Sequence, residues 1–322
     1  MVLIAGSANL DFVVRAAHIP APGETVLGHS FATFPGGKGA NQAVACARAG
    51  GAATQMLLAL GDDAFAAPLI DSLTQAQVGL HTVRALGQPT GTAFICVSAE
   101  GENAITVAPG ANSCLTAADL PSLAGVSHLL MQLETPVPTV LAYAQAARAA
   151  GVKVVLNAAP AQALPGELLA LVDILVVNEG ELAAIVAAQS SKASPLQDAA
   201  SAPIAALSLH DQLAQLDVPC VVVTLGGAGC VARVKNVAVE SGSAHSDKSN
   251  TITQAAYKID VVDTTAAGDT FCGVLVAALS QGHALADALQ TASAAAALTC
   301  TKMGAQSSIP TQAAIKQFML SA

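Results

Sequence analysis

The sequence predicts an α/β fold, a doubly wound, mainly parallel sheet with helices on both faces and a small β-sheet lid. Short, almost continuously apolar runs alternate with Ala-rich helical stretches. Strands that are apolar throughout are typical of parallel sheets buried on both faces. The chain has 322 residues, which at about 100–200 residues per domain is enough for one large core. We therefore expect a single α/β domain over residues 1–322.

The first part of this alternation begins at the N-terminus. The apolar run VLIAG predicts a strand at 2–6, and TQMLLAL predicts another at 54–60. Between them, ANQAVACARAG is rich in alanine, the strongest helix former, and predicts a helix over 40–50. A second helical segment is expected from position 63 to about position 78.

The second part continues in the same order. Short apolar runs predict four more strands, at 127–133, 152–157, 173–178 and 218–226. Helices are expected over 138–150 and from Glu179, and the apolar stretch CGVLVAAL after Phe271 predicts a further helix. Strands separated by helices in this way indicate a parallel sheet.

Two pairs of regions interrupt the alternation. Residues 88–108 contain GTAFICVSAEGENAITVAPG, which predicts a hairpin with AEGEN as its turn. Together with 11–35 it is expected to form the small β lid. The stretches 189–211 and 240–256 are rich in Ser and Ala without strong periodicity. We interpret them as surface insertions without a chemical role.

Composition limits the classes of partner. Hydrophobic residues make up 53% and charged residues 11%, against about 25% charged in typical globular domains, which argues against disorder. No stretch reaches the roughly 18 uninterrupted apolar residues of a membrane-spanning helix. The formal charge of −9 provides no basic surface for nucleic acid or anionic lipid. We expect small-molecule ligands, with no nucleic acid and no membrane.

The cysteines and the N-terminus predict a location. The seven cysteines are at least ten positions apart, so they indicate neither a C-x-x-C site nor a disulfide framework. The start, MVLIAGSANLD, has no basic region before its apolar run, and no signal peptide is predicted. We expect a cytoplasmic protein.

The motif GSANLD follows the first predicted strand, where a doubly wound sheet presents its ligand-binding loops. It is not G-x-G-x-x-G, so a Rossmann oxidoreductase loses its main support. Asn9 and Asp11 offer an amide and a carboxylate suited to a polyhydroxylated ligand. The alternative is that both residues only shape a turn.

The glycine-rich segment PGGKGANQ, at 35–42, opens the first predicted helix. It is not a Walker A motif, which needs four residues between its first Gly and the Gly-Lys-Ser/Thr. Glycines allow close approach to a ligand, and Lys38 and Asn41 add donors at the helix start. A sugar site is plausible here, and a plain glycine turn is the alternative.

The densest signal is DTTAAGDTF, at 263–271. Its small residues leave backbone N–H groups of a helix start open to an anion, so phosphate can be held without a lysine. Asp269 would then stand beside the reacting phosphoryl group and accept the proton of an attacking hydroxyl. The alternative is an ordinary N-cap aspartate.

Three further motifs end predicted strands. Asn178 and Glu181 of NEGE could orient water on Mg²⁺, or simply begin a helix. The glycine loop TLGGAG at 224–229 suits the phosphates of a nucleotide, and NAAPA at 157–161 ends its strand in the same way.

These motifs, in this order, closely resemble those of the ribokinase-like (PfkB-type) carbohydrate kinases. The resemblance spans residues 1–310 nearly end to end, through GSANLD, PGETVLGHSFATFPGGKGANQAVA, GENAITVAPGANS, MQLETP, NAAPA, NEGE, TLGGAG, DTTAAGDTF and KMGAQSSIP. Departures from the family's pattern are the two insertions and, within TCTKMGAQSS, the TCT and Met303. The joint match favours the functional interpretation of Asp269 and of the GGKGAN loop over the structural ones.

The resemblance implies a role for each matching residue. It implies that Asp269 is the catalytic base, with Ala266, Ala267 and Gly268 as the anion-binding turn. Sugar hydroxyls would be held by Asn9, Asp11, Gly37, Lys38, Gly39, Asn41 and Glu134. The ATP site would be lined by Asn178, Thr224, Leu225, Gly226, Gly227, Ala228, Gly229, Gly268 and Ser293. Glu181 would order Mg²⁺ through water. A K⁺ site would use Asp263, Thr265, Thr299, Lys302, Gly304 and Ser308, mostly through main-chain carbonyls.

The activity implied by the resemblance is ATP-dependent phosphorylation of the primary hydroxyl of a pentose, D-ribose to D-ribose 5-phosphate first among the candidates. Asp269 would deprotonate that hydroxyl while the helix-start amides and Mg²⁺ stabilise the transferring phosphoryl group. K⁺ would be an activator, and the lid would pair with its mate in a homodimer. The alternatives are a related kinase acting on another sugar or a nucleoside, and a sugar-binding regulator without catalysis.

Overall fold

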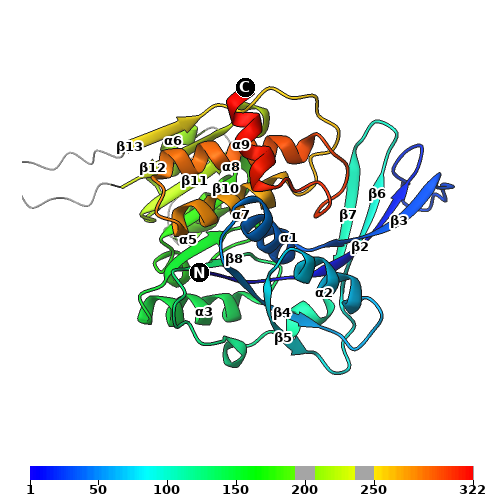
Figure 1. Cartoon of the computed structure of the whole chain (residues 1–322), viewed down its shortest axis with the longest axis horizontal. Helices are drawn as coiled ribbons and strands as arrows, with labels where there is room; N and C mark the ends of the chain where they lie inside the picture. Colours follow the sequence, from blue (N-terminus) through cyan, green and yellow to red (C-terminus); the bar gives the residue numbers. More distant parts are fainter. Residues whose placement is uncertain (193–206, 236–249, 322) are drawn as a thin grey trace, which may run out of the picture.

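The structure, a computed structural model, describes residues 1–192, 207–235 and 250–321. Its main sheet has nine strands in the order β13-β12-β11-β10-β9-β8-β1-β4-β5 (Figure 1). The pairs β11–β12 and β12–β13 are antiparallel, and every other pair is parallel. The strands are β1 Val2–Ala5, β4 Thr54–Leu60, β5 Gly79–Arg84, β8 His128–Met131, β9 Lys153–Asn157, β10 Ile174–Asn178, β11 Cys220–Thr224, β12 Cys230–Val234 and β13 Asn250–Gln254. The predicted mainly parallel sheet is confirmed.

Successive residues of a strand point to opposite faces of the sheet. Because both faces of this sheet are apolar, helices cover both of them. Ile4 and Met56 belong to one buried cluster, whereas their neighbours Leu3 and Leu57 belong to the other. The first cluster is completed by α1 Lys38–Val44 with its π-helical extension Ala45–Ala49, α2 Ala66–Gln75, α7 Ala267–Ser280, α8 Leu285–Cys300 and α9 Gln312–Ser321. The second is completed by α3 Val137–Ala149, α4 Gly166–Leu169, α5 Glu179–Lys192 and α6 Leu209–Ala214. Short 3-10 turns lie at Gly110–Cys114, Ala117–Asp119 and Gly226–Ala228.

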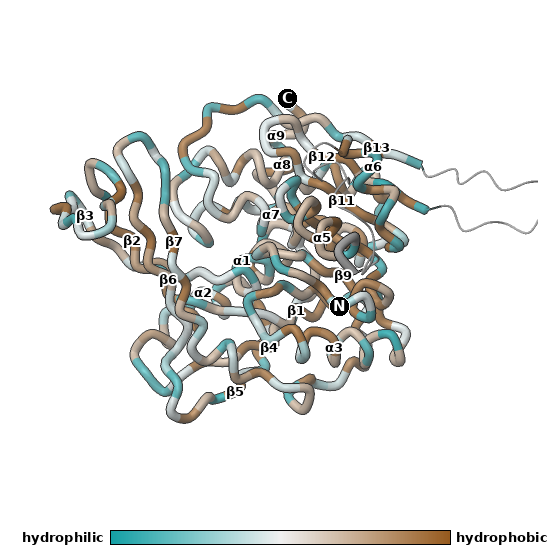
Figure 2. Tube along the Cα trace, turned by 180° about the vertical axis from the view of Figure 1, so that it is seen from behind, coloured by the Kyte–Doolittle hydropathy of each residue, from teal (hydrophilic) through white to brown (hydrophobic). Residues whose placement is uncertain are grey.

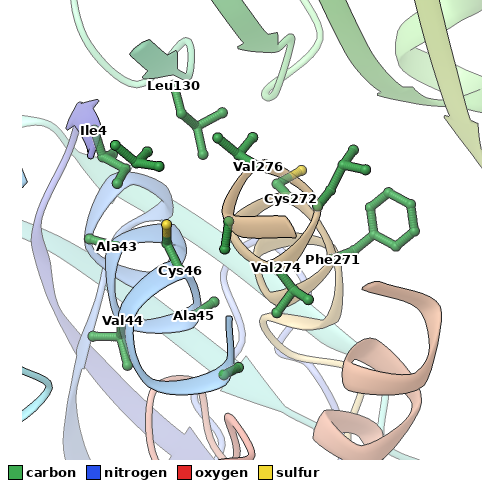
Figure 3. Packing of buried hydrophobic residues seen from close by; sticks show 14 of the residues in the cluster. Ile4, Ala43, Val44, Ala45, Cys46, Leu130, Phe271, Cys272, Val274 and Val276 are labelled. Atoms are coloured by element: carbon green, nitrogen blue, oxygen red, sulfur yellow. The ribbon is translucent and has the colours of Figure 1, made fainter. Parts of the chain in front are cut away.

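Helices α1 and α7 pack side by side, as Figure 3 shows. Small residues line the contact, among them Ala45 and Cys46 of the extension of α1. Gly273 of α7 faces them, and a Cβ at this position would lie 2.7 Å from the Cβ of Ala45. The alanine-rich composition of these two helices therefore allows their backbones to approach closely, which brings the polar residues at the start of α1 to the start of α7.

A second sheet of four strands projects from the body (Figure 1). Its order is β3-β2-β6-β7, with β3 Ser30–Gly36, β2 Asn9–Arg15, β6 Gly91–Val97 and β7 Asn103–Ala108. Phe12 stacks on Phe31 and Phe94, with ring centroids 6.1 and 5.4 Å apart. Figure 2 shows hydrophobic colour along β2 and β6. Both Phe31 and Phe94 are exposed, so the small sheet carries apolar side chains on its surface.

The chain crosses between the two sheets at four places, which we call the neck: residues 6–8, Gly37, 85–90 and Pro109. One glycine of the neck and one directly after it are required by their surroundings. Gly37 has φ +88°, and a Cβ on it would lie 2.7 Å from the backbone nitrogen of Asn9. A Cβ on Gly91, at the start of β6, would lie 2.3 Å from Asn9 Oδ1. The neck is therefore a tightly packed crossing.

Several elements differ from the expectation. The strands β5, β12 and β13 were not predicted. The edge strands β5 and β13 carry exposed polar residues, and the short β12, CVARV, is interrupted by Arg233. The stretch 240–256 was expected to lack regular structure, yet Asn250–Gln254 is a strand paired with β12. Of the predicted insertions 189–211 and 240–256, residues 193–206 and 240–249 lie outside the described residues. Helix α7 begins at Ala267, before the apolar run that predicted it.

Among the helices in the described ranges, none is both long enough and apolar enough to cross a membrane.

Candidate active site

Asp269 is buried in the first turn of α7. The N-cap of this helix is Ala266, in the left-handed conformation with φ +59°, and no side chain caps the helix. The carboxylate of Asp269 instead accepts one hydrogen bond on each oxygen, from Asn41 Nδ2 and Gln42 Nε2, both at 2.9 Å. The helix-cap alternative for Asp269 is therefore wrong. The carboxylate faces α1 as a hydrogen-bond acceptor.

The start of α7 also offers backbone amides. The N–H of Ala267 donates to the carbonyl of Thr264 at 3.2 Å, which occupies one of the amides expected to bind an anion. Gly268, the next residue, lines two adjacent cavities, and a Cβ on it would meet no protein atom within 4 Å. Its backbone therefore borders open space at the positive end of the helix dipole.

The smaller cavity, of about 240 Å³, is polar. Its lining includes Lys38, Asn157, Asn178, Glu181, Thr224 and Asp269. Burial alone would lower the pKa of Lys38, but the carboxylates of Asp269, Glu134 and Glu181 together raise it. The ammonium group is thus held charged among carboxylates, as a binder of negatively charged groups must be.

Asn178 and Glu181 lie at the start of α5 and bond to each other. The backbone N–H of Asn178 donates to Glu181 Oε2, and the N–H of Glu181 donates to Asn178 Oδ1, each at 2.8 Å. This reciprocal cap fulfils the structural alternative for the pair. Burial raises the pKa of Glu181. Both residues also line the polar cavity, so one pair begins the helix and faces the site.

The larger cavity, of about 600 Å³, adjoins the first through Thr224, Thr264 and Gly268. Its lining includes the predicted glycine-loop residues Gly226, Gly227, Ala228 and Gly229, together with Ser293. Leu225 does not line it, because its side chain packs against the core on the opposite face of the sheet.

The same cavity is also lined by residues that the sequence motifs did not indicate. Ala255, Ala256 and Tyr257 form part of its wall, although 240–256 was interpreted as an insertion without a chemical role. The expectation is wrong at this end of the stretch, because β13 carries the chain directly to the cavity.

The remaining sugar candidates lie at the neck and at the base of the small sheet. Asp11 is buried, and burial, with the negative charges of Glu134 and Asp269, raises its pKa to about 7. Glu134 accepts hydrogen bonds from the backbone N–H of Lys38, at 3.1 Å, and from the hydroxyl of Ser7. The negative charges of Glu134 and Asp269 therefore both reach the carboxylate of Asp11.

The glycines of GGKG contact protein rather than open space. Cβ atoms on Gly37 and Gly39 would lie within 3 Å of backbone atoms in the chain at 6–9. Their lack of side chains is explained by this close approach.

Part of the predicted K⁺ set comes together. Asp263 Oδ1 accepts from the N–H and hydroxyl of Thr265, at 2.9 and 2.6 Å, and Asp263 Oδ2 accepts from the N–H of Gly304 at 2.9 Å. Thr299 is buried in α8, where its hydroxyl donates to the carbonyl of Ala295 and is also hydrogen-bonded to the hydroxyl of Thr270. The other two are separate from these bonds: the hydroxyl of Ser308 donates to the carbonyl of Ala305, and Lys302 is exposed. In the described ranges, no group of three or more His, Cys, Asp or Glu residues is arranged to hold a metal ion.

The match with a known family now decides the identity. Residues 1–312 match the family described as "pfkB family carbohydrate kinase". The chain belongs to the pfkB family. The resemblance given by the sequence motifs is thereby confirmed, and the protein is a carbohydrate kinase.

Individual pfkB-family members are similar over the full chain. A ribokinase from Haemophilus influenzae is 38% identical over 321 residues, which cover 98% of this chain and 97% of that protein. The crystal structure of a ribokinase from Thermotoga maritima matches with a TM-score of 0.81 and 33% identity, covering 99% of both chains. A ribokinase from Arabidopsis thaliana, complexed with ribose and ATP, matches with a TM-score of 0.82 and 29% identity, covering 99% and 98%.

In this pfkB-family chain, three amides near the site were not predicted from the sequence. Gln42 bonds to Asp269, Gln132 bonds to Gln42, and Asn112 donates to Asn9 Oδ1 at 2.7 Å. Each lies within or beside a motif that carries the resemblance, but its partner is distant in sequence. Only the fold shows that these amides serve the site residues.

Proposed function

We propose that the protein transfers the γ-phosphoryl group of ATP to the primary hydroxyl of D-ribose, giving D-ribose 5-phosphate and ADP. One observation carries the proposal. The buried carboxylate of Asp269, at the start of α7, lines the polar cavity, and its charge, with that of Glu134, raises the pKa of the buried Asp11. The names of the ribokinases to which the chain is similar support ribose as the sugar.

In the proposed reaction Asp269 takes the proton of the sugar hydroxyl. The resulting oxygen attacks the γ-phosphorus, the bond from that phosphorus to the bridging β–γ oxygen breaks, and ADP leaves. The amides at the start of α7 and the ammonium group of Lys38 stabilise charge on the transferring group. The sugar hydroxyls are held by Asn9, Asp11, Gly37, Lys38, Gly39, Asn41 and Glu134.

We further propose that the two adjoining cavities together hold ATP. The larger one, bordered by the glycine loop and the side chains of Tyr257 and Phe271, takes the adenosine part. The polar one takes the phosphates, beside Asn178, Thr224 and Gly268. Because the two cavities adjoin, together they suit a ligand that is apolar at one end and charged at the other.

Two cations belong to the proposal. Carboxylate and amide oxygens suit Mg²⁺, and Glu181 in the polar cavity would hold it through water. When bound, Mg²⁺ neutralises phosphate charge. For K⁺, the carboxylate of Asp263 joins the segment before α7 to the loop at 302–308, so carbonyls from both can face one ion.

We propose that the chain forms one kinase domain over 1–322, in which the small sheet, from about 11–35 and 88–108, closes over the sugar. Closure would exclude water that could hydrolyse ATP. Exposed Phe31 and Phe94 would pair this sheet with that of a second copy in a homodimer. The seven free cysteines suit a reducing cytoplasm.

The test is an ADP-release assay with ATP and a panel of pentoses, hexoses and nucleosides, with and without K⁺. Ribose is expected to give the highest kcat/KM. A higher value for another sugar or a nucleoside would overturn the substrate, and release of no ADP with any acceptor would overturn the activity itself. Sugar binding measured by calorimetry would then identify a regulator.

A further inference from the structure

Gln42 stands directly behind the carboxylate that receives the proton. It is fully buried, and its Nε2 donates to Asp269 Oδ1 at 2.9 Å. It lines neither of the two cavities. The amide of Gln42 therefore acts on Asp269 and not on a ligand in those cavities.

An amide has a donor end and an acceptor end, so its orientation decides whether it supports or repels a carboxylate. Gln42 Nε2 also donates to Asn157 Oδ1 at 2.9 Å, and Asn157 Nδ2 donates to the carbonyl of Val176 at 3.1 Å. Because a backbone carbonyl can only accept, it fixes the orientation of Asn157. Asn157 in turn requires the NH₂ end of Gln42.

Gln132 fixes the opposite end of the same amide. This fully buried residue follows β8, and its Nε2 donates to Gln42 Oε1 at 2.6 Å. The carbonyl oxygen of Gln132 has no hydrogen-bond partner among the described residues. A buried unpaired oxygen costs about 1–3 kcal/mol. The fold nevertheless keeps Gln132 in the orientation that places its donor toward Gln42.

We propose that Gln132, Gln42 and Asn157 form an amide relay whose function is to position Asp269 for proton transfer. Gln42 and Gln132 are positioning residues: the first holds the carboxylate, and the second keeps the first from turning its oxygen toward that carboxylate. This inference rests on the proposed kinase reaction and adds to it Gln42 and Gln132, which line neither of the two cavities. Misplacement of a reacting group by about 1 Å can cost roughly 100-fold in rate.

The kinetic test compares Gln42→Met, Gln132→Met and the double variant, using the best acceptor found in the sugar panel. We expect each single change to lower kcat about 10- to 100-fold, with KM for sugar and ATP within about threefold of wild type. Since Gln132 acts through Gln42, the double variant should be no slower than Gln42→Met. A fall in kcat accompanied by a higher KM and a lower melting temperature would overturn the relay. So would losses in kcat that multiply in the double variant.

Gln212→Met is the matched control. Among the described residues, Gln212 also has a carbonyl oxygen without a partner, and its Nε2 donates there to the backbone of Leu207 alone. Its replacement should leave kcat unchanged. Should the Met variants fold poorly, Gly6→Ala disturbs the same relay, because its Cβ would lie 2.0 Å from Gln132 Oε1. It should lower kcat in the same selective way, and an unchanged kcat would count against the relay.

A second measurement needs no turnover and separates failure of the relay from failure of the proposed reaction. The side-chain NH₂ protons of Gln42 should exchange slowly with solvent in NMR spectra of the wild-type protein, and faster in Gln132→Met. If the wild type phosphorylates nothing in the panel, the proposed function falls while this measurement still decides the relay. Equal exchange rates in the two proteins would overturn the relay even in an active kinase.

Discussion

Gly304 donates its backbone N–H to the carboxylate of Asp263 at 2.9 Å, although 41 positions separate the two residues. The bond joins the segment that leads into α7 to the loop that follows α8. Hydrogen bonds from Thr265 and Gly304 lower the pKa of Asp263 against the opposing effect of burial. The carboxylate therefore stays charged beside the helix start that we assign to phosphate.

From this arrangement we predict that K⁺ activates the enzyme more than Na⁺ does. A large monovalent cation would order the carbonyls around Asp263 and with them the turn at 264–268. Initial rates with saturating K⁺, saturating Na⁺ and neither cation measure the effect. Asp263→Asn should abolish the difference between the cations. Equal rates in all three buffers for the wild type would contradict the K⁺ site.

Asp269→Asn should lower kcat by about 10²- to 10⁴-fold, the usual contribution of a general base. The amide keeps the shape of the side chain but cannot take the proton. Calorimetry should show that ribose and ATP still bind, which separates loss of chemistry from loss of the site. If the variant kept more than half of the wild-type kcat, Asp269 would not be the base.

Asn9 should make the enzyme prefer D-ribose over 2-deoxy-D-ribose. Asn112 donates to Asn9 Oδ1, which leaves the NH₂ group of Asn9 for the 2-hydroxyl. A closed site that leaves this donor unpaired loses about 1–3 kcal/mol, or roughly 5- to 150-fold in kcat/KM. We expect at least about tenfold preference in the wild type and a smaller one in Asn9→Ala. Equal kcat/KM values for the two sugars in the wild type would exclude this contact.

Stability should fall as the pH rises toward 7, and Asp11 is one cause. Its pKa is raised from 3.8 to about 7 by burial and by the charges of Glu134 and Asp269. Between these values the folded protein binds the Asp11 proton more tightly than the unfolded chain does, so rising pH favours unfolding. Asp11→Asn should therefore become more stable relative to the wild type as the pH rises from about 4 to about 7. Urea unfolding of both proteins at pH 5 and pH 8 tests this, and a pH-independent difference would refute it.

Gly268→Ala should raise the KM for ATP about tenfold without lowering stability. A Cβ there would meet no protein atom, but it would enter the junction of the two cavities. Gly166→Ala is the matched control, because Gly166 also lies in the first turn of a helix and its Cβ would meet nothing within 4 Å. Steady-state kinetics and thermal unfolding of both variants separate the two effects. An unchanged KM for ATP in Gly268→Ala would place the phosphates elsewhere.

The sequence predicts the elements whose signal is local. Thr54–Leu60 and Ile174–Asn178 are buried strands with nearly continuous apolar runs, and both lie where the runs predict them. β5, by contrast, is an edge strand whose residues GLHTVR are partly exposed. Without a fully buried environment it has no apolar run to reveal it. The insertion predicted at 240–256 failed at Asn250–Gln254 for the same reason.

The residues of the candidate site likewise fall into those with a local sequence signal and those without one. Asp269 and Asn41 belong to dense motifs, so their residue types and spacing along the chain are enough to indicate chemistry. Gln42 and Gln132 do not stand out in this way, because their significance lies in bonds across 227 and 90 positions. A glutamine in an alanine-rich helix is typical of an ordinary helix. Only the close packing of α1 against α7 gives it a carboxylate partner.

The neck implies an uneven map of mutational tolerance. Its segments carry few side chains that would touch a ligand, yet an added methyl group at Gly37 or Gly91 would collide with the atoms that hold Asn9 in place. Gly101, in the turn between β6 and β7, has open space around it. In a saturation library selected for growth on ribose, variants at the four crossings should therefore be depleted. The turn around Gly101 should accept most substitutions that its left-handed backbone permits. Damage to catalysis would then arise through backbone packing as well as through lost ligand contacts.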